Sequence, residues 1–542
     1  MNLQSKRRWD RETFWVVVLA TSASTAAFLI YFRNGELLLF GDAVAHINIA
    51  RRVFDSRTPG LLQLGTVWLP LPHVLMIPFL LSDRLWVTGV GGSLPSMVAY
   101  VLGVVVIFRL VRGTVDPVAR GLSASLAAGF APAIYGLNPN LLYLQSTAMT
   151  ESLYLALFIW AVVHFCEFIR QRGEDAWNPE TLRSLWKCGL CLFAACLVRY
   201  DGWFLAVFIA GVVVFLALRT RNLGSLRAAL VFGVIAGAAP VIWFAYNAAV
   251  YGNAMEFANG PYSARAIEKK TAVPGFPSHP GTGNLAVAGL YVVKAGEFSV
   301  AEGNWQRVWL LVAFAGSLLL VFRDRRNAAL LVLWIPLPFY MLSVAYGGVP
   351  IFTPAWWPFS FYNIRYGVQL LPALVVFLVL ATYYSVLFVS ARSGRAIIGL
   401  LAAALVITSY IGVWRAQPGA FREAWVNSRT RLQLERALAE QLRGLPARTT
   451  LLMYLGEHVG ALQDAGIPLT RTINEGNHRV WKQPFDPTGL WEQSLTDPAK
   501  HADFVVAFEG DPVWQAVHNR DLPTVAILGV NGQRTAVIFR TR

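Results

Sequence analysis

Long apolar runs separated by short polar loops occupy most of residues 13–414. A helix needs about 20 residues to cross the hydrocarbon of a bilayer, and backbone groups in lipid must be hydrogen-bonded within the protein. We therefore expect a transmembrane helix in each of the runs 13–32, 86–108, 121–137, 147–169, 184–199, 202–218, 228–250, 305–322, 327–346, 366–390 and 396–414. The pattern predicts an all-α polytopic membrane protein with about eleven transmembrane helices.

The loops between these runs alternate in charge. The outer loop 138–146 contains no Lys or Arg. Positive charge marks the cytoplasmic side, so we expect a cytoplasmic N-terminus, an uncleaved signal-anchor as the first helix, and residues 415–542 outside. With this orientation the inner loops carry Arg109, Arg112 and Arg120, then Arg170, Arg172, Arg183 and Lys187, then Arg219, Arg221 and Arg227, then Arg323, Arg325 and Arg326, then Arg392 and Arg395.

The C-terminal region follows a different pattern. Residues Arg429 to Arg443 form a charged amphipathic stretch that predicts a helix. Short β-like runs follow at Thr449–Leu455, Asp503–Phe508, Thr524–Val530 and Thr535–Arg540. Helical and turn segments separate them, which predicts a small α/β or α+β soluble domain. We expect a transmembrane catalytic domain over 1–414 and an extracytoplasmic, periplasmic domain over 415–542.

The composition excludes some classes of function. Hydrophobic residues make up 56% of the chain and charged residues 14%, against about 25% charged in soluble domains. A net charge of +15 would suggest nucleic acid in a soluble protein, but here the basic residues gather in inner loops, so we expect no nucleic-acid partner. The pair Cys188 and Cys191 lies inside an expected membrane helix, where packing is the better interpretation than metal binding.

The first long outer segment holds the strongest candidate for chemistry. Asp42 follows closely on the first span, and residues 42–56 fit an amphipathic helix lying in the membrane interface. Asp42 and His46 are one turn apart and face the same side. A simple N-cap role for Asp42 is an equally good interpretation of this spacing alone.

Further polar residues lie at the outer ends of later spans. Glu151 is a carboxylate at membrane depth, which is costly and often functional, although a helix N-terminus also favours it. Arg199 and Asp201 fit a structural pair or a catalytic one. Arg365, followed by Tyr366, is suited to binding phosphate or to anchoring at the headgroups.

These candidates map to one outer interface, where His73 and Trp68 are also expected. A sugar carried on a lipid phosphate matches this arrangement. Its leaving group is already a stable anion, so the reaction needs no general acid. It needs a carboxylate to take the acceptor proton and a cation to hold the departing phosphate, roles for which Asp42 and Arg365 are suited.

The sequence resembles the GT-C superfamily of membrane glycosyltransferases over the whole membrane region. The group it most resembles is the bacterial protein O-mannosyltransferase-like, or glycosyltransferase family 39-like, group, to which the aminoarabinose transferase of lipid A belongs. The segments that carry the resemblance are GDAVAHINIARR (41–52), WLPLPH (68–73), AMTESLYLALF (148–158), RYDGWFL (199–205) and NIRYGVQLLPAL (363–374).

The resemblance implies a GT-C fold with interfacial helices in the first outer loop and a place in the bacterial inner membrane. It implies an inverting transferase that moves a sugar from a polyprenyl-phosphate donor to a lipid, glycan or protein acceptor outside the cytoplasm. Asp42 and Glu151 are the expected catalytic residues: Asp42 matches the catalytic base and Glu151 a second acidic position, while Arg365 matches the contact to the lipid phosphate. The expected donor-binding group is Arg365, Tyr366, Arg199, His46 and His73.

One position departs from the family pattern. Ala43 follows Asp42, where many relatives have a second acidic residue. This departure counts against a divalent metal bound by a paired acidic motif. Because metal dependence varies across the superfamily, the metal stays open, with His46 and Glu151 as the residues that could hold it. Two other classes of function match the sequence less well. A transporter or flippase of a lipid-linked sugar would favour inverted repeats, which the sequence does not show, and a non-catalytic scaffold would leave the outer polar residues unexplained.

Overall fold

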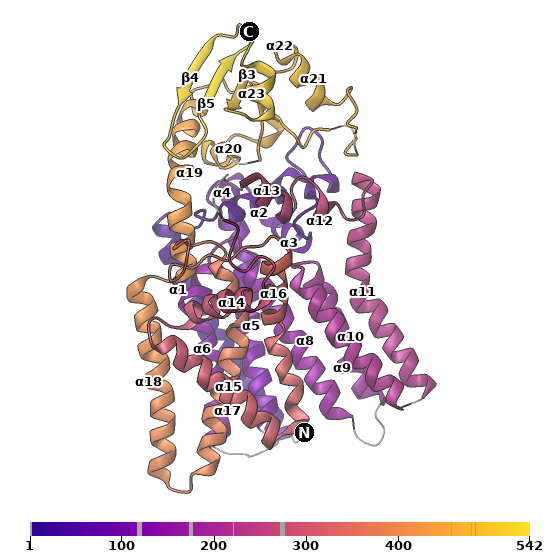
Figure 1. Ribbon diagram of the computed structural model, residues 1–542, viewed down its shortest axis with the longest axis vertical. Helices are drawn as coiled ribbons and strands as arrows, with labels where there is room; N and C mark the ends of the chain where they lie inside the picture. The colour runs from indigo at the N-terminus through magenta and orange to yellow at the C-terminus, as the bar shows by residue number, and fades with distance from the viewer. Residues whose placement is uncertain are drawn as a thin grey trace.

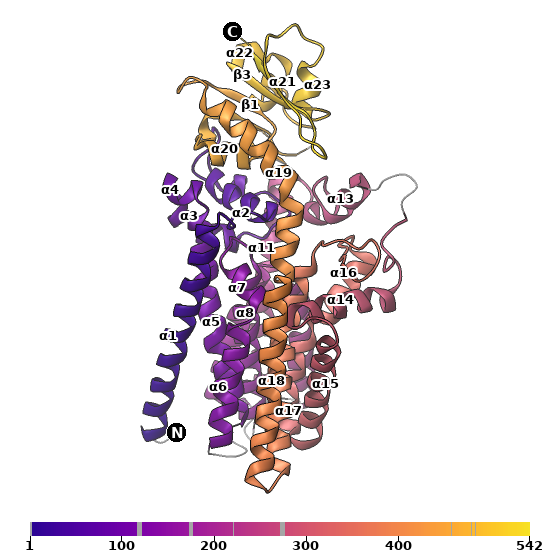
Figure 2. The same ribbon diagram turned by 90° about the vertical axis from the view of Figure 1, so that its left-hand side faces the viewer.

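The computed structural model describes residues 3–115, 122–172, 177–220, 222–271, 277–456, 458–478, 480–482 and 484–541. Long helices run side by side below a small sheet, and the N-terminus and the sheet lie at opposite ends of the bundle (Figures 1 and 2). The inner-loop residues Arg120 and Arg221 lie outside the described part of the chain.

The chain is a multi-pass membrane protein. Within the described residues, nine helices are long and apolar enough to cross a bilayer. The predicted spans 121–137 and 184–199 correspond to the shorter helix α6 (Leu122–Gly136) and to α9 (Pro179–Cys196). The count of eleven and the orientation stay predictions. The nine are α1 (Leu3–Arg33), α5 (Val90–Val115), α8 (Glu151–Gln171), α10 (Asp201–Thr220), α11 (Leu223–Tyr251), α15 (Trp305–Arg323), η2 with α16 (Arg325–Trp334 and Pro336–Tyr346), η3 with α17 (Ile364–Leu370 and Leu371–Phe388) and α18 (Arg392–Ala416) with its continuation.

The first outer segment forms four short helices above the bundle (Figure 2). They are α2 (Gly41–Arg52), η1 (Leu61–Leu64), α3 (Leu71–Leu80) and α4 (Asp83–Val87). The expected helix is therefore present, but α2 ends at Arg52 and not at residue 56. The chain turns there because Asp55 binds Arg51 Nε at 2.7 Å and also accepts the backbone N–H of Thr470.

The second outer segment contains α12 (Glu256–Asn259), α13 (Ala264–Thr271) and α14 (Leu285–Val300). Helix α14 is apolar but has only 16 residues, fewer than a bilayer span needs, so none of the eleven predicted transmembrane runs includes it. It packs against α16 and η3, and so supports the segment that carries Arg365.

The C-terminal region is an α/β unit at the end of a long helix, α19 (Gly419–Arg443). Its sheet has the order β2-β1-β3-β5-β4. Strands β1, β2 and β3 are parallel, and β5 runs antiparallel to β3 and β4. The four predicted strands are present; β2 was not predicted because two residues carry no pattern. The elements are β1 (Leu451–Met453), α20 (Gly460–Ala465), η4 (Leu469–Arg471), β2 (Thr472–Ile473), α21 (Leu490–Thr496), α22 (Pro498–His501), β3 (Phe504–Phe508), α23 (Pro512–Val517), β4 (Thr524–Leu528) and β5 (Ala536–Arg540).

The start of α19 differs from the prediction. The helix begins at Gly419, ten residues before the expected Arg429, because α18 and α19 follow each other with a break only around Gln417, which has a φ of 65°. The proposed division of the chain after residue 414 stays a prediction.

A closed set of buried hydrogen bonds joins this unit to the first outer segment. Asn48 on α2 donates to Gln463 Oε1 at 2.7 Å and accepts from Trp86 Nε1 at 3.0 Å. Gln463 on α20 in turn donates to the carbonyl of Trp86 at 2.8 Å. Buried polar groups that are fully paired specify one arrangement. The position of α2 is therefore fixed partly by the C-terminal unit.

Candidate functional site

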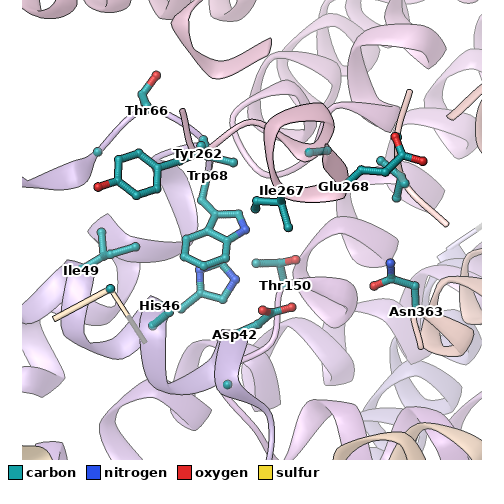
Figure 3. Close-up of a pocket in the computed structure, with 18 of the residues that line it drawn as sticks. Asp42, His46, Ile49, Thr66, Trp68, Thr150, Tyr262, Ile267, Glu268 and Asn363 are labelled. Atoms are coloured by element: carbon teal, nitrogen blue, oxygen red, sulfur yellow. The ribbon is translucent and has the colours of Figure 1, made fainter. Parts of the chain in front are cut away.

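A cavity of about 2060 Å³ lies between the C-terminal unit and the ends of the membrane helices that face it. Its walls come from α2, the loop before α3, the start of α8, the turn before α10, the loop before η3 and the loops after β1 and β2. Figure 3 shows Asp42, His46, Trp68 and Tyr262 among the residues that line it.

Asp42 lies in the first turn of α2 but is not its N-cap. Phe40 occupies the cap position and makes no side-chain cap hydrogen bond. The carboxylate instead faces the cavity, where Oδ2 accepts a hydrogen bond from Arg365 Nη2 at 2.5 Å. The side chain remains 41% exposed, so an incoming molecule can reach it.

Arg365 is buried at the start of η3 and is held on several sides. Its Nη1 pairs with Glu423 on α19, and its Nε lies 3.5 Å from Glu151 Oε1. The rings of Phe40 and Tyr366 each lie 5.0 Å from its guanidinium carbon. Glu423 also accepts the backbone N–H of Arg365 at 3.1 Å. Three carboxylates and two aromatic faces leave this guanidinium little freedom.

Arg199 forms a second cationic centre beside the first. Its Nη1 lies 3.4 Å from Glu151 Oε1, and its Nε lies 3.3 Å from Asp201 Oδ1. Nη2 donates to the hydroxyl of Tyr340 at 2.8 Å, and that hydroxyl donates to Asp201 at 3.1 Å. The ring of Tyr366 lies 5.0 Å from the Arg199 guanidinium carbon. One aromatic ring thus separates the two arginines.

The cluster holds two guanidinium groups and four carboxyl groups. The side chains of Glu151, Asp201 and Glu423 are 0–2% exposed. All four line the cavity, and Asp42 is the one of the four with a substantially exposed side chain. Because Glu151 contacts both arginines, it fixes their separation. An anion that enters the cavity can therefore reach Arg365 most easily by replacing Asp42.

The two candidate histidines form a buried pair. His46 Nδ1 lies 2.9 Å from His73 Nε2, and the ring of His46 packs 4.7 Å from that of Trp68. Burial, aided by the charges of Arg199 and Arg365, lowers the pKa of His46 from 6.5 to about 3. His46 and Trp68 line the cavity, whereas His73 lies behind His46 and does not. The pair is therefore neutral at physiological pH.

The donor set for a metal is limited in this region. Among the residues that the structure describes, no three His, Cys, Asp or Glu side chains come together as metal ligands. Glu151 Oε1 lies against two arginines and His46 Nδ1 against His73. Glu151 Oε2 has no hydrogen-bond partner among the described residues, so it remains for a cation together with Asp42 Oδ1 and His46 Nε2.

Two residues of the site were not predicted from the sequence. Glu423 lies in a helix rich in charged residues, so nothing in the sequence distinguishes it from its charged neighbours. Tyr340 lies in an apolar span, where the sequence alone indicates a tyrosine that packs in the core. Both contact an arginine that was predicted.

No protein-family model matches the sequence, and no curated protein matches it either. Solved structures match over nearly the whole chain. ArnT from Cupriavidus metallidurans bound to undecaprenyl phosphate matches with a TM-score of 0.58 at 14% identity over 98% of both chains. The same protein in the apo state gives 0.55 at 12% identity, again over 98% of both chains.

A second protein matches as well. Archaeal oligosaccharyltransferase AglB from Archaeoglobus fulgidus, in complex with an inhibitory peptide and a dolichol-phosphate, matches with a TM-score of 0.50 at 14% identity. The match covers 92% of this chain and 69% of that chain. At these identities the matches show the fold. The chain has the GT-C fold, as the resemblance in its sequence predicted.

Proposed function

We propose that this protein is an inverting glycosyltransferase that takes its sugar from a polyprenyl-phosphate donor. The observation that carries the proposal is the contact between Asp42 and Arg365 on the wall of a large cavity at the outer ends of the membrane helices. The GT-C fold supports it, because ArnT with the same fold was solved with undecaprenyl phosphate and AglB with a dolichol-phosphate.

The reaction needs one base and one cationic site. The hydroxyl oxygen of the acceptor attacks the anomeric carbon opposite the phosphate, and Asp42 takes the hydroxyl proton. The bond from the anomeric carbon to the phosphate oxygen breaks, and the lipid phosphate leaves with the electron pair. Arg365 holds this phosphate, and its charge stabilises the negative charge that develops there. The attack from the opposite face inverts the anomeric centre.

The other buried side chains position these two groups. The Glu423 carboxylate aligns Arg365 by binding both its guanidinium and its backbone N–H. Glu151 sets the distance between Arg365 and Arg199. We assign to Glu151 a positioning role, because its contacts are to arginines and its side chain is 0% exposed. Tyr366, between the two guanidinium groups, keeps them apart.

The orientation follows from the same proposal. A polyprenyl tail would lie in the bilayer while its phosphate and sugar reach the cavity. The C-terminal unit stands at one end of the bundle (Figure 1), and residues of that unit line the cavity. With a cytoplasmic N-terminus this end lies outside the cytoplasm, in the periplasm of a bacterium. Residues 415–542 then form an extracytoplasmic domain that covers the catalytic domain 1–414.

A reconstituted assay tests this function. The protein is placed in liposomes with undecaprenyl phosphate carrying a radiolabelled sugar, and cell-envelope extract supplies acceptors. Label in a new glycosidic bond, with release of undecaprenyl phosphate, is expected from wild type and not from Asp42→Asn. Movement of intact labelled lipid across the bilayer without a new bond would overturn the proposal in favour of a transporter.

A further inference from the structure

A second group of polar and aromatic residues lines the cavity away from the two arginines. It comprises Arg52 at the end of α2, Tyr251 at the end of α11, Tyr262 before α13, Tyr454 after β1 and Glu475 after β2. We name it the upper cluster. None of its members contacts the Asp42–Arg365 pair in the interactions described above, so the proposed sugar transfer leaves the cluster without a role.

The upper cluster lies at the edge of the sheet where ligands usually bind. Tyr454 and Glu475 follow the carboxyl ends of the parallel strands β1 and β2 directly, and Pro512 follows β3; all three line the cavity. β1 and β3 are neighbours in the sheet. After β1 the chain continues to β2 on one side of this pair, and after β3 it continues to β4 and β5 on the other side. Open α/β sheets bind ligands outside the carboxyl ends of their strands at such a switch point.

The cluster also has unused capacity for hydrogen bonds. The Nε atom of Arg52 is buried and has no hydrogen-bond partner among the described residues. The hydroxyls of Tyr262 and Tyr454 lie 3.3 Å apart, and Glu475 accepts the backbone N–H of Leu455 at 2.9 Å. Buried polar groups without partners are uncommon in native proteins and call for an explanation. A ligand hydroxyl that accepts from Arg52 Nε would supply the missing partner.

The chemistry of the cluster matches a neutral carbohydrate. One guanidinium and one carboxylate balance in charge, so the cluster does not select an anion. The three tyrosines offer aromatic faces for the C–H groups of a sugar ring and hydroxyls that both donate and accept hydrogen bonds. An extended peptide would instead pair with an exposed sheet edge, whereas the cavity meets the ends of the strands.

We propose that the upper cluster binds the acceptor, and that the acceptor is a neutral glycan. This inference rests on the proposed function, because it assigns the substrate whose hydroxyl faces Asp42. Asp42 and Arg52 both lie on the cavity side of α2, ten residues apart, which is about 15 Å along a helix axis. A short oligosaccharide bridges that distance, with its reactive unit at Asp42 and its next units against the tyrosines.

A binding experiment tests the inference separately from catalysis. Full-length protein in nanodiscs is applied to an array of defined neutral di- to tetrasaccharides and to a matched array of unstructured peptides. Glu475→Gln and Tyr454→Ala test the cluster. Tyr346→Ala is the matched control, since Tyr346 is 51% exposed and does not line the cavity. Binding of undecaprenyl phosphate reports whether each variant folds.

Wild type is expected to bind at least one glycan, and the two cluster variants to bind it about tenfold more weakly through the loss of one charged or aromatic contact. Tyr346→Ala should bind glycan like wild type, and all variants should bind undecaprenyl phosphate like wild type. Three outcomes would each overturn the inference: wild type binds none of the glycans, wild type binds a peptide that the cluster variants no longer bind, or the cluster variants bind the glycan as tightly as wild type does. Wild type that binds glycan but not undecaprenyl phosphate would overturn the proposed donor alone.

Discussion

Replacing Asp42 by Asn should stop the reaction and at the same time tighten the binding of the lipid phosphate. Every nitrogen of the Arg365 guanidinium faces a carboxylate in the structure. A phosphate must therefore replace one of them, and Asp42 is the only one of the three with a substantially exposed side chain. The Asn variant keeps the shape of the side chain but gives up its charge, so it competes less with the phosphate.

The size of the effect follows from the burial of the pair. The Arg365 side chain is 7% exposed and the Asp42 side chain 41%, so water and salt screen the contact in part. Partly exposed ion pairs of this kind contribute about 1 kcal/mol, which corresponds to about fivefold in affinity. Undecaprenyl phosphate should therefore bind Asp42→Asn about fivefold more tightly than wild type. Loss of a general base should slow transfer by about 10²–10⁴-fold.

Titration of undecaprenyl phosphate into nanodisc-embedded protein, followed by native mass spectrometry, measures the affinity. Undecaprenol, which lacks the phosphate, should bind both proteins alike. Asp83→Asn is the matched control: Asp83 belongs to the same outer segment and pairs with Arg51 at 2.5 Å, but it does not line the cavity. If Asp42→Asn bound the lipid phosphate equally well or more weakly than wild type, the competition for Arg365 would be refuted.

Arg365→Lys keeps the charge but removes the planar fork, so undecaprenyl phosphate should bind about tenfold more weakly; equal affinity in the same titration would contradict this role. Glu423→Gln leaves a buried backbone N–H without an acceptor, and should lower the unfolding free energy by about 1–3 kcal/mol, read as a lower melting temperature; an unchanged melting temperature would count against it. Burial lowers the pKa of His46 to about 3 in the folded protein, from 6.5 in the unfolded chain. The unfolded chain therefore takes up a proton first as the pH falls, and the free energy of unfolding decreases from pH 6.5 toward pH 3. The melting temperature of wild type should fall between pH 6.5 and 5, and that of His46→Gln should fall less; parallel curves would refute this assignment. Gln463→Leu should lower both melting temperature and transfer rate although Gln463 does not line the cavity, and an unchanged rate would show that α20 does not position α2.

The membrane helices were predictable because the bilayer dictates both their length and their apolar character. The interfacial helix α2 was predictable from its amphipathic spacing. Helix α14 was not, since its 16 residues are too few to span and its apolar surface is covered by other protein segments. Strand β2 was not, since two residues in a strand leave no alternation to detect.

The polar cluster shows a similar limit. Asp42, Glu151, Arg199 and Arg365 attract notice because each charge lies at a membrane boundary, and the structure brings all four together. Glu423 does not stand out in the sequence in this way. Its neighbours in α19 are also charged, and only the crossing of α19 past η3 turns this one carboxylate toward Arg365. A pairing that depends on how two distant helices cross cannot be read from one sequence.

Helix α2 connects the two ends of the proposed reaction. It carries Asp42 at its first turn and Arg52 at its last, and Asn48 between them is bonded to Gln463 of the C-terminal unit. Asp42, the proposed base, and Arg52, one of the five residues of the proposed glycan site, therefore lie on one helix. Since the distance between Asp42 and Arg52 is set by a helix and not by a loop, a glycan held by Arg52 and the tyrosines presents the hydroxyl that falls at Asp42. The choice of acceptor hydroxyl would then be decided by where the glycan is held against the tyrosines, and a change at Gln463 that tilts α2 would alter which hydroxyl reacts as well as how fast.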